Sequence, residues 1–385
     1  MEKEQEQPEG GLTHLLSLVW YQVLPARFGG QKGIAQFNDH LSRHFRLSYL
    51  CSSDNIPSGK EGYTVIPELP VGRRQVLFPW NWKRIFDKAG ALGVTHIILE
   101  HAYYGIPAIL LKSSGLPLIA HSHNLENERF RSLGRWWWPL LRILERRVHR
   151  AADLSLFKTE ADRSAAIQAF GLDPERCMVL PYGLEREALP NAAEKRSASE
   201  KIRARYGLDD DEKILYFNGT LDYEPNAEAL RFLVNELLPE LDKISGFHYR
   251  LLVTGRNQRA RFSNLLALRH DRYLPLGMLD EVDEIFLAAD LFLNPVTSGG
   301  GIKVKTMEAL SWGLPVVSTP HAATGLELGL TGTRLYVAGS AEPAAFAQAI
   351  LKALEDRSVI PPGFFDTYRW EAVIASLVAR IASLR

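Results

Sequence analysis

The sequence has little cysteine, no excess of either charge and no long apolar run. Its two cysteines, Cys51 and Cys177, are too few and too isolated for a disulfide framework or a cysteine metal site, which favours a reducing compartment. Lysine plus arginine equal aspartate plus glutamate at 45 each, so no global field draws the chain to nucleic acid. No stretch reaches the roughly 18 apolar residues that cross a bilayer. We therefore expect a cytoplasmic protein that binds no nucleic acid and spans no membrane, although it can lie on one.

What is present is the composition of a folded protein large enough for two domains. The chain has 385 residues, of which 46% are hydrophobic and 23% are charged. The first ten residues are polar and acidic and lack the basic start and apolar core of a signal peptide. We predict a disordered tail at 1–10.

Short strand-like runs alternate with helical patterns along the chain, as in βαβ units with a parallel sheet. The first half has predicted strands at 15–24, 46–51, 95–100, 117–123, 154–158 and 177–182. The second half has them at 214–220, 249–255, 273–277, 289–295, 314–319 and 334–339. This alternation of strands and helices predicts an N-terminal domain at 11–190, a charged linker at 191–212, a second α/β domain at 213–365 and a C-terminal helix at 366–385.

A glycine-rich turn between two predicted strands is the strongest candidate site. In SGGGIKVKTMEALSWG, from Ser298 to Gly313, glycines let backbone amides approach an anion, and the following helix N-terminus adds positive charge. Lys303 and Lys305 oppose the helix dipole there unless an anion binds. Glu308 lies one turn after Lys305, so a lysine could meet phosphates while the glutamate accepts from ribose hydroxyls. The alternative is a solvated Lys305–Glu308 surface pair.

The stretch GGIKVKTMEALSWGLPVVSTPHAATGL resembles the donor signature of the family 4 glycosyltransferases of the GT-B fold. NGTLDYEPNAEALRFLVNELLPEL (218–241) and AADLFLNP resemble other parts of that donor domain, so the resemblance covers most of 213–340. It implies two Rossmann-like domains with parallel sheets facing a central cleft, and a C-terminal helix that returns to the N-terminal domain. It also implies a UDP- or GDP-linked sugar donor and transfer with retention of configuration. No cofactor and no metal ion are expected, since the sequence shows no clustered Asp pair or histidine–carboxylate set.

The chain departs from the family pattern at two places. The family motif carries two glutamates seven residues apart; Glu308 matches the second, but Gly300 stands at the first. The arginine and lysine that follow the first donor strand in many relatives are absent from NGTLDYEPN, so Lys303, Lys305 and Arg256 are expected to supply that charge. Arg256 follows a predicted strand, where this fold exposes ligand-binding loops, but it could also be an ordinary surface arginine. The predicted donor-binding residues are Arg256, Gly300, Gly301, Ile302, Lys303, Lys305 and Glu308.

In the first half, His121 and His123 end a predicted strand in PLIAHSHNLENERF. Relatives carry a histidine here near the reacting sugar, and His123 is the closer match. Three roles are open for His123. A neutral ring would hydrogen-bond the sugar or the acceptor, and a protonated ring would offset the phosphate charge. In the third, the histidine only caps the end of the strand and takes no part in the chemistry. Glu126 is predicted as a base or acceptor-orienting group, or as a carboxylate that only complements a helix dipole. His123 and Glu126 are the predicted catalytic residues.

Two further segments carry weaker predictions. RFGGQKG, with Gly29 and Gly30, resembles the family's glycine loop at the cleft and does not fit a pyridine-nucleotide fingerprint. Trp136, Trp137 and Trp138 lie among arginines in 129–150, which predicts either a membrane-surface element or a core-facing helix with solvated arginines. With a membrane surface, the acceptor would be lipid-linked or another membrane-bound molecule.

The sequence therefore predicts a glycosyltransferase that moves a sugar from a nucleotide-sugar to a lipid-linked or cell-envelope glycan acceptor. A nucleotide-sugar epimerase of related architecture would share the glycine turn and the glutamate. Because Gly300 replaces an expected glutamate, a catalytically silent partner subunit that binds nucleotide or membrane is the third alternative.

Overall fold

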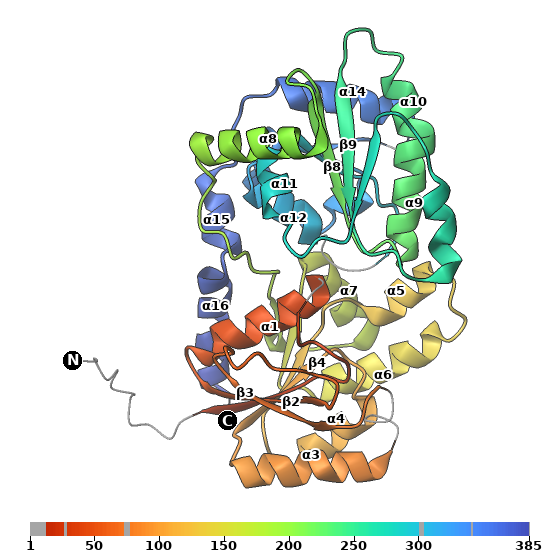
Figure 1. Ribbon diagram of the computed structural model, residues 1–385. Helices are drawn as coiled ribbons and strands as arrows, with labels where there is room; N and C mark the ends of the chain where they lie inside the picture. Colours follow the sequence, from red (N-terminus) through yellow and green to blue (C-terminus); the bar gives the residue numbers. More distant parts are fainter. Residues whose placement is uncertain (1–12, 27–28, 73–77, 300–303, 340–341, 385) are drawn as a thin grey trace, which may run out of the picture. The chain divides into compact units, whose positions relative to one another are not determined.

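The computed structural model describes residues 13–26, 29–72, 78–299, 304–339 and 342–384. The chain forms two compact units: unit 1 comprises the residues up to Gly183 together with Trp370–Arg385, and unit 2 comprises Leu184–Arg369. Each unit is built on one parallel sheet (Figure 1). The predicted α/β class with two Rossmann-like units is therefore confirmed.

Unit 1 has a seven-stranded sheet in the order β3-β2-β1-β4-β5-β6-β7. The order reverses between β1 and β4, as in Rossmann-like sheets. The strands are β1 (His14–Leu18), β2 (Arg46–Ser52), β3 (Thr64–Leu69), β4 (His96–Glu100), β5 (Leu118–His121), β6 (Leu154–Phe157) and β7 (Cys177–Val179). The helices are α1 (Gly29–Ser42), α3 (Pro79–Leu92), α4 (Gly105–Ser113), α5 (Glu126–Ser132), α6 (Trp138–Ala151), α7 (Glu160–Phe170) and α16 (Trp370–Ala382).

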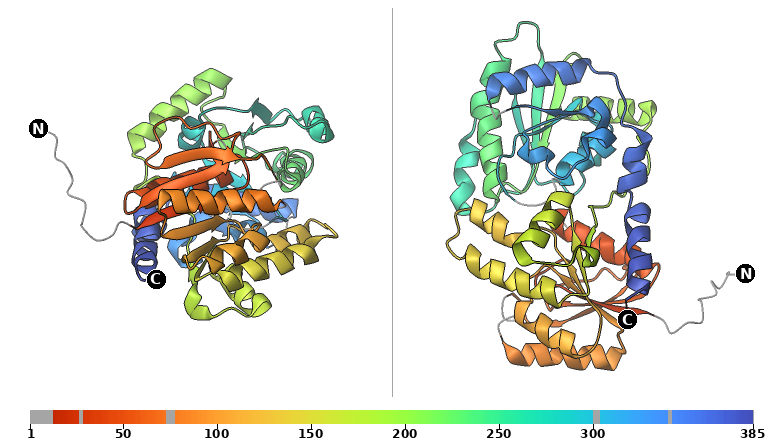
Figure 2. Two further views of the ribbon diagram at one scale, coloured as in Figure 1. Left: turned by 90° about the horizontal axis from the view of Figure 1, so that it is seen from below. Right: turned by 180° about the vertical axis from the view of Figure 1, so that it is seen from behind.

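Alternate residues of β1 face opposite layers of helices, because side chains along a strand alternate in direction. Leu15 belongs to a buried cluster with Phe37 of α1 and Trp370 of α16. Leu16 belongs to the cluster on the other face, which includes side chains of α3, α4 and α6. Helices cover both faces of this sheet in Figures 1 and 2. The strands are thus buried on both sides, which explains their nearly continuous apolar sequence.

The C-terminal helix α16 packs beside α1 and belongs to unit 1, as predicted (Figure 1). Trp370 at its start is fully buried. A Cβ atom at Gly183 would lie 2.1 Å from the Trp370 ring, so only glycine fits there. The short helix before it, α15 (Pro362–Tyr368), belongs to unit 2. The predicted helix at 366–385 is therefore two helices that divide at Arg369.

Unit 2 has a six-stranded sheet in the order β10-β9-β8-β11-β12-β13. The strands are β8 (Lys213–Asn218), β9 (Tyr249–Thr254), β10 (Tyr273–Gly277), β11 (Leu291–Asn294), β12 (Val316–Ser318) and β13 (Leu335–Val337). The main helices are α8 (Ala192–Tyr206), α9 (Glu224–Phe232), α10 (Leu238–Leu241), α11 (Asp283–Ala288), α12 (Val304–Ser311), α13 (Leu328–Thr331) and α14 (Pro343–Glu355). Phe217 of β8 packs in one core cluster with Phe346 of α14, and Tyr216 faces Phe286 of α11 on the opposite side.

The range predicted as a linker, 191–212, contains helix α8 instead. Asn191 and Glu194 form a reciprocal capping box at its start, and Gly207 ends it with a φ of 64°. The helix packs against α11 within unit 2. Its sequence is polar because it buries only Ala198 and Ile202. The chain passes between the units at 183–184 and again at 369–370.

Two strands differ from the sequence prediction in unit 1. β3 was not predicted, because Pro67 interrupts its pattern; it is an edge strand whose register with β2 shifts beside that proline. β1 ends at Leu18 rather than at residue 24. Beyond it, the backbone N–H groups of Val23 and Leu24 donate to the side chain of Asn55 at 2.8 and 2.9 Å instead of pairing with a neighbouring strand.

Candidate functional site

The carboxyl edge of the unit 1 sheet gathers polar residues from three adjacent strands. Glu100 ends β4 and His121 ends β5, and the two are register partners. His121 is level with Leu156 of β6, so Lys158 follows β6 at the same edge. Open parallel sheets bind their ligands at this edge. Parallel pairing thus assembles side chains that lie far apart in the sequence.

Glu100 lies between two histidines. Nε2 of His123 lies 2.6 Å from Oε2 of Glu100, and Nδ1 of His121 lies 3.0 Å from the same oxygen. Because an ionised carboxylate can only accept, both rings donate to it. Glu100 and His121 are buried, whereas the His123 side chain is 13% exposed. This histidine–carboxylate set is not evident in the sequence, because it forms only when β4 and β5 pair.

Burial keeps both histidines neutral. It lowers the pKa of His121 and of His123 well below the usual value, and the nearby Lys158 charge lowers that of His121 further. Lys158 is itself buried, and its pKa falls to about 8 because burial disfavours the ammonium while Glu100 favours it. The positive charge nearest to Glu100 in this cluster is therefore the Lys158 ammonium, since both histidine rings are neutral.

Glu100, His121 and His123 form a cluster compact enough to share a metal ion, because their possible ligand atoms lie within 4.8 Å of one another. It is the one such cluster of histidine, cysteine and acidic residues in the part of the chain that the structure describes. Two neutral imidazoles and a carboxylate are plausible zinc ligands by type. Both rings, however, already donate to the carboxylate. Hydrogen bonding accounts for the arrangement, and we assign no metal to it.

His101, which the sequence analysis did not single out, completes the cluster. Its φ of 68° is left-handed, a region that few residues other than glycine adopt. Its ring lies against that of His123, tilted by 33° with centroids 4.4 Å apart, and its Nε2 lies 3.0 Å from the Tyr21 hydroxyl. The sequence signal for His101 was its position directly after the predicted strand 95–100, just as His123 is the last residue of the predicted strand 117–123.

Glu126 lies at the start of α5, as expected, but its carboxylate is enclosed. It accepts from the Tyr103 hydroxyl at 2.7 Å and from Arg129 at 2.9 Å. Burial alone would raise its pKa, but Arg129 and the other donors hold the pKa of Glu126 below its ordinary value. The helix N-terminus is capped by Glu145, which accepts from the backbone N–H of Glu126 at 2.6 Å. The geometry favours an orienting role for Glu126 over that of a base.

In unit 2, Lys305 on α12 reaches the carboxyl end of the neighbouring strand β8. Its Nζ donates to the backbone carbonyl of Asn218 at 3.1 Å and to the Asn226 side-chain oxygen at 2.7 Å. It also lies 4.7 Å from the centroid of the Phe217 ring. The ammonium is therefore held at the sheet edge by neutral oxygens rather than extended into solvent.

Glu308 lies one helical turn beyond Lys305 and is half-buried. Burial raises the pKa of Tyr216 on β8, and the nearby Glu308 charge raises it further. The Glu308 charge is thus close enough to β8 to act on Tyr216. The predicted residues Gly300, Gly301, Ile302 and Lys303 lie outside the described residues.

Arg256 is fixed by the loop that follows β8. Its Nε lies 3.1 Å from Oδ2 of Asp222, whose nearly buried carboxylate also accepts from the backbone N–H groups of Gln258 and Arg259 at 2.8 Å each. A Cβ atom at Gly255 would lie 1.9 Å from the Gly219 carbonyl oxygen, so the two strand ends can approach only because residue 255 is glycine. Asp222 compensates much of the charge that the sequence analysis expected Arg256 to offer a phosphate.

Gly29 and Gly30, predicted as a loop, are the first residues of helix α1. No atom lies within 4 Å of a Cβ built at Gly30, so nothing in the described structure requires glycine there. Gly33 is different, because a Cβ there would lie 2.7 Å from the Tyr182 ring.

The three tryptophans do not share one environment. Trp136 is 88% exposed, whereas Trp137 and Trp138 are half-buried, the former against Phe130 and the latter under Arg131. Helix α6 buries one side in the core and exposes another, and it packs beside α4. We use the name α4–α6 face for the exposed apolar side chains on α4, on α6 and just before α6: Ile109, Leu110, Trp136, Leu140 and Ile143. No helix of the described residues is long and apolar enough to cross a membrane.

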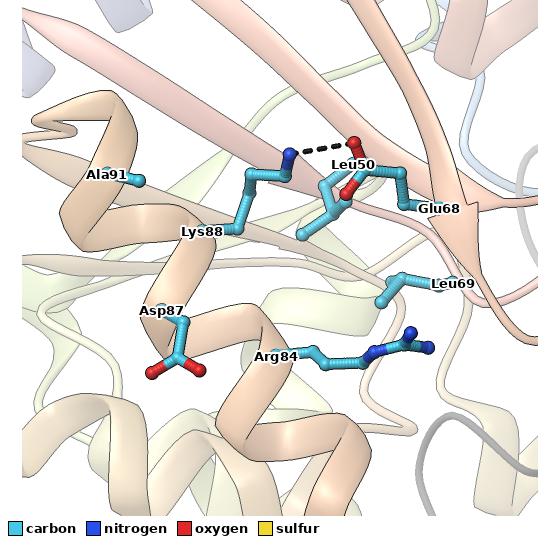
Figure 3. Close-up of a pocket in the computed structure, with 7 residues that line it drawn as sticks. All are labelled: Leu50, Glu68, Leu69, Arg84, Asp87, Lys88 and Ala91. Atoms are coloured by element: carbon cyan, nitrogen blue, oxygen red, sulfur yellow. Dashed lines mark hydrogen bonds and ion pairs between the residues drawn. The ribbon is translucent and has the colours of Figure 1, made fainter.

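A separate hollow of about 530 Å³ lies in unit 1, between α3 and strands β2 and β3 (Figure 3). Lys88 reaches across it to Glu68 at 2.7 Å, while Arg84 and Asp87 extend from the same helix. None of the predicted site residues lines it, and its acidic and basic side chains are balanced. We assign it no ligand.

Two family models match the chain, one to each half. "Glycosyltransferase Family 4" matches residues 29–188, and "Glycosyl transferases group 1" matches residues 212–356, which include the Lys305–Glu308 edge. The chain belongs to the family 4 glycosyltransferases.

Curated relatives agree with this family. The D-inositol 3-phosphate glycosyltransferase of Gordonia bronchialis is 27% identical over 256 residues, 62% of this chain and 54% of the relative. The protein of the same name from Geodermatophilus obscurus is 26% identical over 284 residues, 69% of this chain and 60% of the relative. The matches thus span little more than half of these relatives' lengths.

Solved structures share the fold. Anabaena Alr3699/HepE, crystallised with UDP and glucose, superimposes with a TM-score of 0.72 at 17% identity and covers 96% of this chain and 99% of that one. Sucrose-phosphate synthase from Thermosynechococcus elongatus gives 0.73 at 15% identity with the same coverage. At these identities the likeness shows the two-unit GT-B fold alone.

Proposed function

We propose that the chain is a glycosyltransferase that takes a sugar from a nucleotide-sugar bound by unit 2 and transfers it, with retention of configuration, to an acceptor bound by unit 1. The observation that carries this proposal is the placement of Lys305 against the end of β8, with Glu308 one turn further along α12. A cation and a carboxylate at that edge match a diphosphate and a ribose. Family membership supports the same reaction class.

The charges of unit 2 would act on the leaving group. A nucleoside diphosphate gains negative charge as the bond to the sugar breaks, so Lys305 would stabilise the transition state more than the bound substrate. The neutral histidines of unit 1 would hold hydroxyl groups instead. No cofactor and no metal ion take part in this proposal.

We take UDP as the first nucleotide to test and GDP as the second. An Anabaena structure of the same fold was obtained with UDP-glucose.

For the acceptor we propose a lipid-linked sugar or another membrane-bound glycan on the cytoplasmic side of a membrane. The α4–α6 face supports this proposal, because exposed apolar side chains there lie among arginines of the 129–150 segment. Such a surface matches the interface of an anionic leaflet.

Sedimentation with anionic vesicles tests the membrane proposal. Replacing Trp136, Leu140 and Ile143 together by serine should release most of the bound chain. Trp80, which is 63% exposed on α3, provides the matched control, since its replacement should change binding little. Equal sedimentation of the triple variant and the wild type would remove the membrane from the proposal.

A thermal-shift screen with UDP, GDP, ADP and TDP and their sugar conjugates tests the function itself. A ligand that binds only the folded chain raises its Tm, so one nucleotide family should stabilise it. Conversion of the donor without any acceptor would instead indicate the epimerase. Stabilisation without turnover would indicate a silent nucleotide-binding subunit, and no stabilisation by any nucleotide would contradict the donor site.

A further inference from the structure

We propose that Glu100 is a positioning residue that fixes His123 as the Nε2–H tautomer and leaves Nδ1 of that ring as a hydrogen-bond acceptor for a sugar hydroxyl. The proposal rests on the proposed function for the identity of the hydroxyl, but not for the state of the ring. It selects one of the two roles that the sequence left open for His123.

The tautomer follows from the short contact with Glu100. Nε2 of His123 lies 2.6 Å from a carboxylate oxygen, which can only accept, so Nε2 carries the proton. A neutral imidazole has one N–H, and Nδ1 is then left with its lone pair. Nδ1 of His123 makes no hydrogen bond within the described residues and is not among their buried unpartnered atoms, unlike Nε2 of His121. It is therefore the atom of the cluster that can accept from a ligand.

The ring is held in orientation as well as in tautomer. The rings of His101 and His121 both lie against His123, with centroids 4.4 and 4.3 Å away and ring planes tilted by 33° and 37°. His121 donates to Glu100 in turn, so the carboxylate is anchored from two strands. Rotation of the His123 ring would break its bond to Glu100.

The surrounding charges favour the neutral ring. Glu100 would attract a proton onto the histidines, but Lys158 supplies a positive charge at the same edge. A protonated His123 would also face two neighbouring imidazoles that disfavour its charge. The titratable and charged groups around the ring are Tyr21 after β1, Glu100 and His101 at β4, His121 at β5, Lys158 at β6, and Glu126 and Arg129 on α5.

This state suits a hydroxyl rather than a phosphate. A neutral acceptor nitrogen binds an O–H donor, whereas a phosphate has no proton to give at neutral pH and repels a lone pair. The exposed end of the cluster is therefore matched to a sugar hydroxyl, either on the transferred sugar or on the acceptor.

Long-range ¹H–¹⁵N NMR of histidine-labelled protein tests the tautomer without any need for activity. His123, assigned from the spectrum of His123→Gln, should show one protonated Nε2 and one unprotonated Nδ1, unchanged from neutral pH down to about pH 5.5, since its pKa is lowered by burial. A protonated Nδ1, or an imidazolium at neutral pH, would overturn the proposal.

Two variants test the causes. In Glu100→Leu the His123 signals should move to the average of both tautomers, and kcat should fall about tenfold, the loss usual when a supporting hydrogen-bond partner is removed, with donor KM nearly unchanged. In Lys158→Met the removal of the cation should raise the pKa of His121, because the Lys158 charge adds to burial in lowering it. Glu212→Gln, a buried glutamate of unit 2, should leave the His123 signals in place.

The outcomes separate this inference from the proposed function. Retention of a single Nε2–H tautomer in Glu100→Leu would show that Glu100 does not position the ring. Should Glu100→Leu fail to fold, Glu100→Gln and the wild-type spectrum decide. Glutamine keeps one acceptor oxygen but places an NH₂ donor where the second carboxylate oxygen was, so His123 should lose its single Nε2–H tautomer. If the wild type shows the expected tautomer but transfers no sugar, the proposed function fails and the positioning role stands.

Discussion

The carboxyl edges of the two sheets occupy equivalent places in similar folds but differ in chemistry. In unit 1 the edge is a closed cluster in which Glu100 accepts from two neutral histidines. In unit 2 the edge presents Lys305 and Glu308 from a helix that follows the neighbouring strand. Neutral hydrogen-bonding groups match hydroxyls, and a cation matches a diphosphate. The fold thus supplies the location, and the residues after each strand decide which part of the substrates is bound.

Among the variants considered, replacement of Lys305 should weaken nucleotide binding most. Lys305→Ala should weaken binding of the stabilising nucleotide about 10- to 100-fold, because hydrogen bonds to charged groups contribute about 1.5–3 kcal/mol. Glu308→Ala should also weaken it. The nucleotide-induced rise in Tm measures the effect, and Lys243→Ala, an exposed lysine paired with Glu240, is the control. Unchanged Tm shifts in both site variants would remove the donor site from α12.

Replacing His123 should affect turnover rather than donor binding. His123→Ala should lower kcat about tenfold and change donor KM less than about threefold, because one hydrogen bond near the reacting groups is lost. Initial rates of nucleoside diphosphate release give both constants. The exposed His44 is the matched control, and a rise in KM with kcat unchanged would assign His123 to donor binding instead.

The smallest effect is expected at Arg256. Asp222 compensates its charge, so Arg256→Ala should weaken nucleotide binding less than about threefold, because the ion pair leaves little of the guanidinium charge for a phosphate. The same Tm measurement applies. A loss as large as that of Lys305→Ala would mean that Arg256 leaves Asp222 to bind the phosphates.

Much of the fold could be predicted because β-branched runs separated by helical patterns leave few arrangements open. The exceptions have local causes. Pro67 concealed the edge strand β3, where a proline is tolerated because one side of the strand is unpaired. The charged residues 191–212 suggested a linker, although the Asn191–Glu194 capping box marks the start of a helix.

The candidate site was less predictable because it depends on strand neighbours. His123 was found from its place at the end of a predicted strand. Glu100 and His101 lie at the end of a different strand, β4, and become relevant only once β4 and β5 pair. The compensation of Arg256 by Asp222 likewise joins two loops far apart in the sequence. Three consecutive tryptophans suggested one surface, yet a helical turn points neighbouring side chains in different directions, and only Trp136 is exposed.

Calorimetric titration of the stabilising nucleoside diphosphate into Lys305→Ala and His123→Ala, side by side with the wild type, tests the division of labour most directly. We predict that Lys305→Ala loses most of the affinity and that His123→Ala keeps the wild-type dissociation constant. Loss of affinity in His123→Ala with full affinity in Lys305→Ala would contradict it.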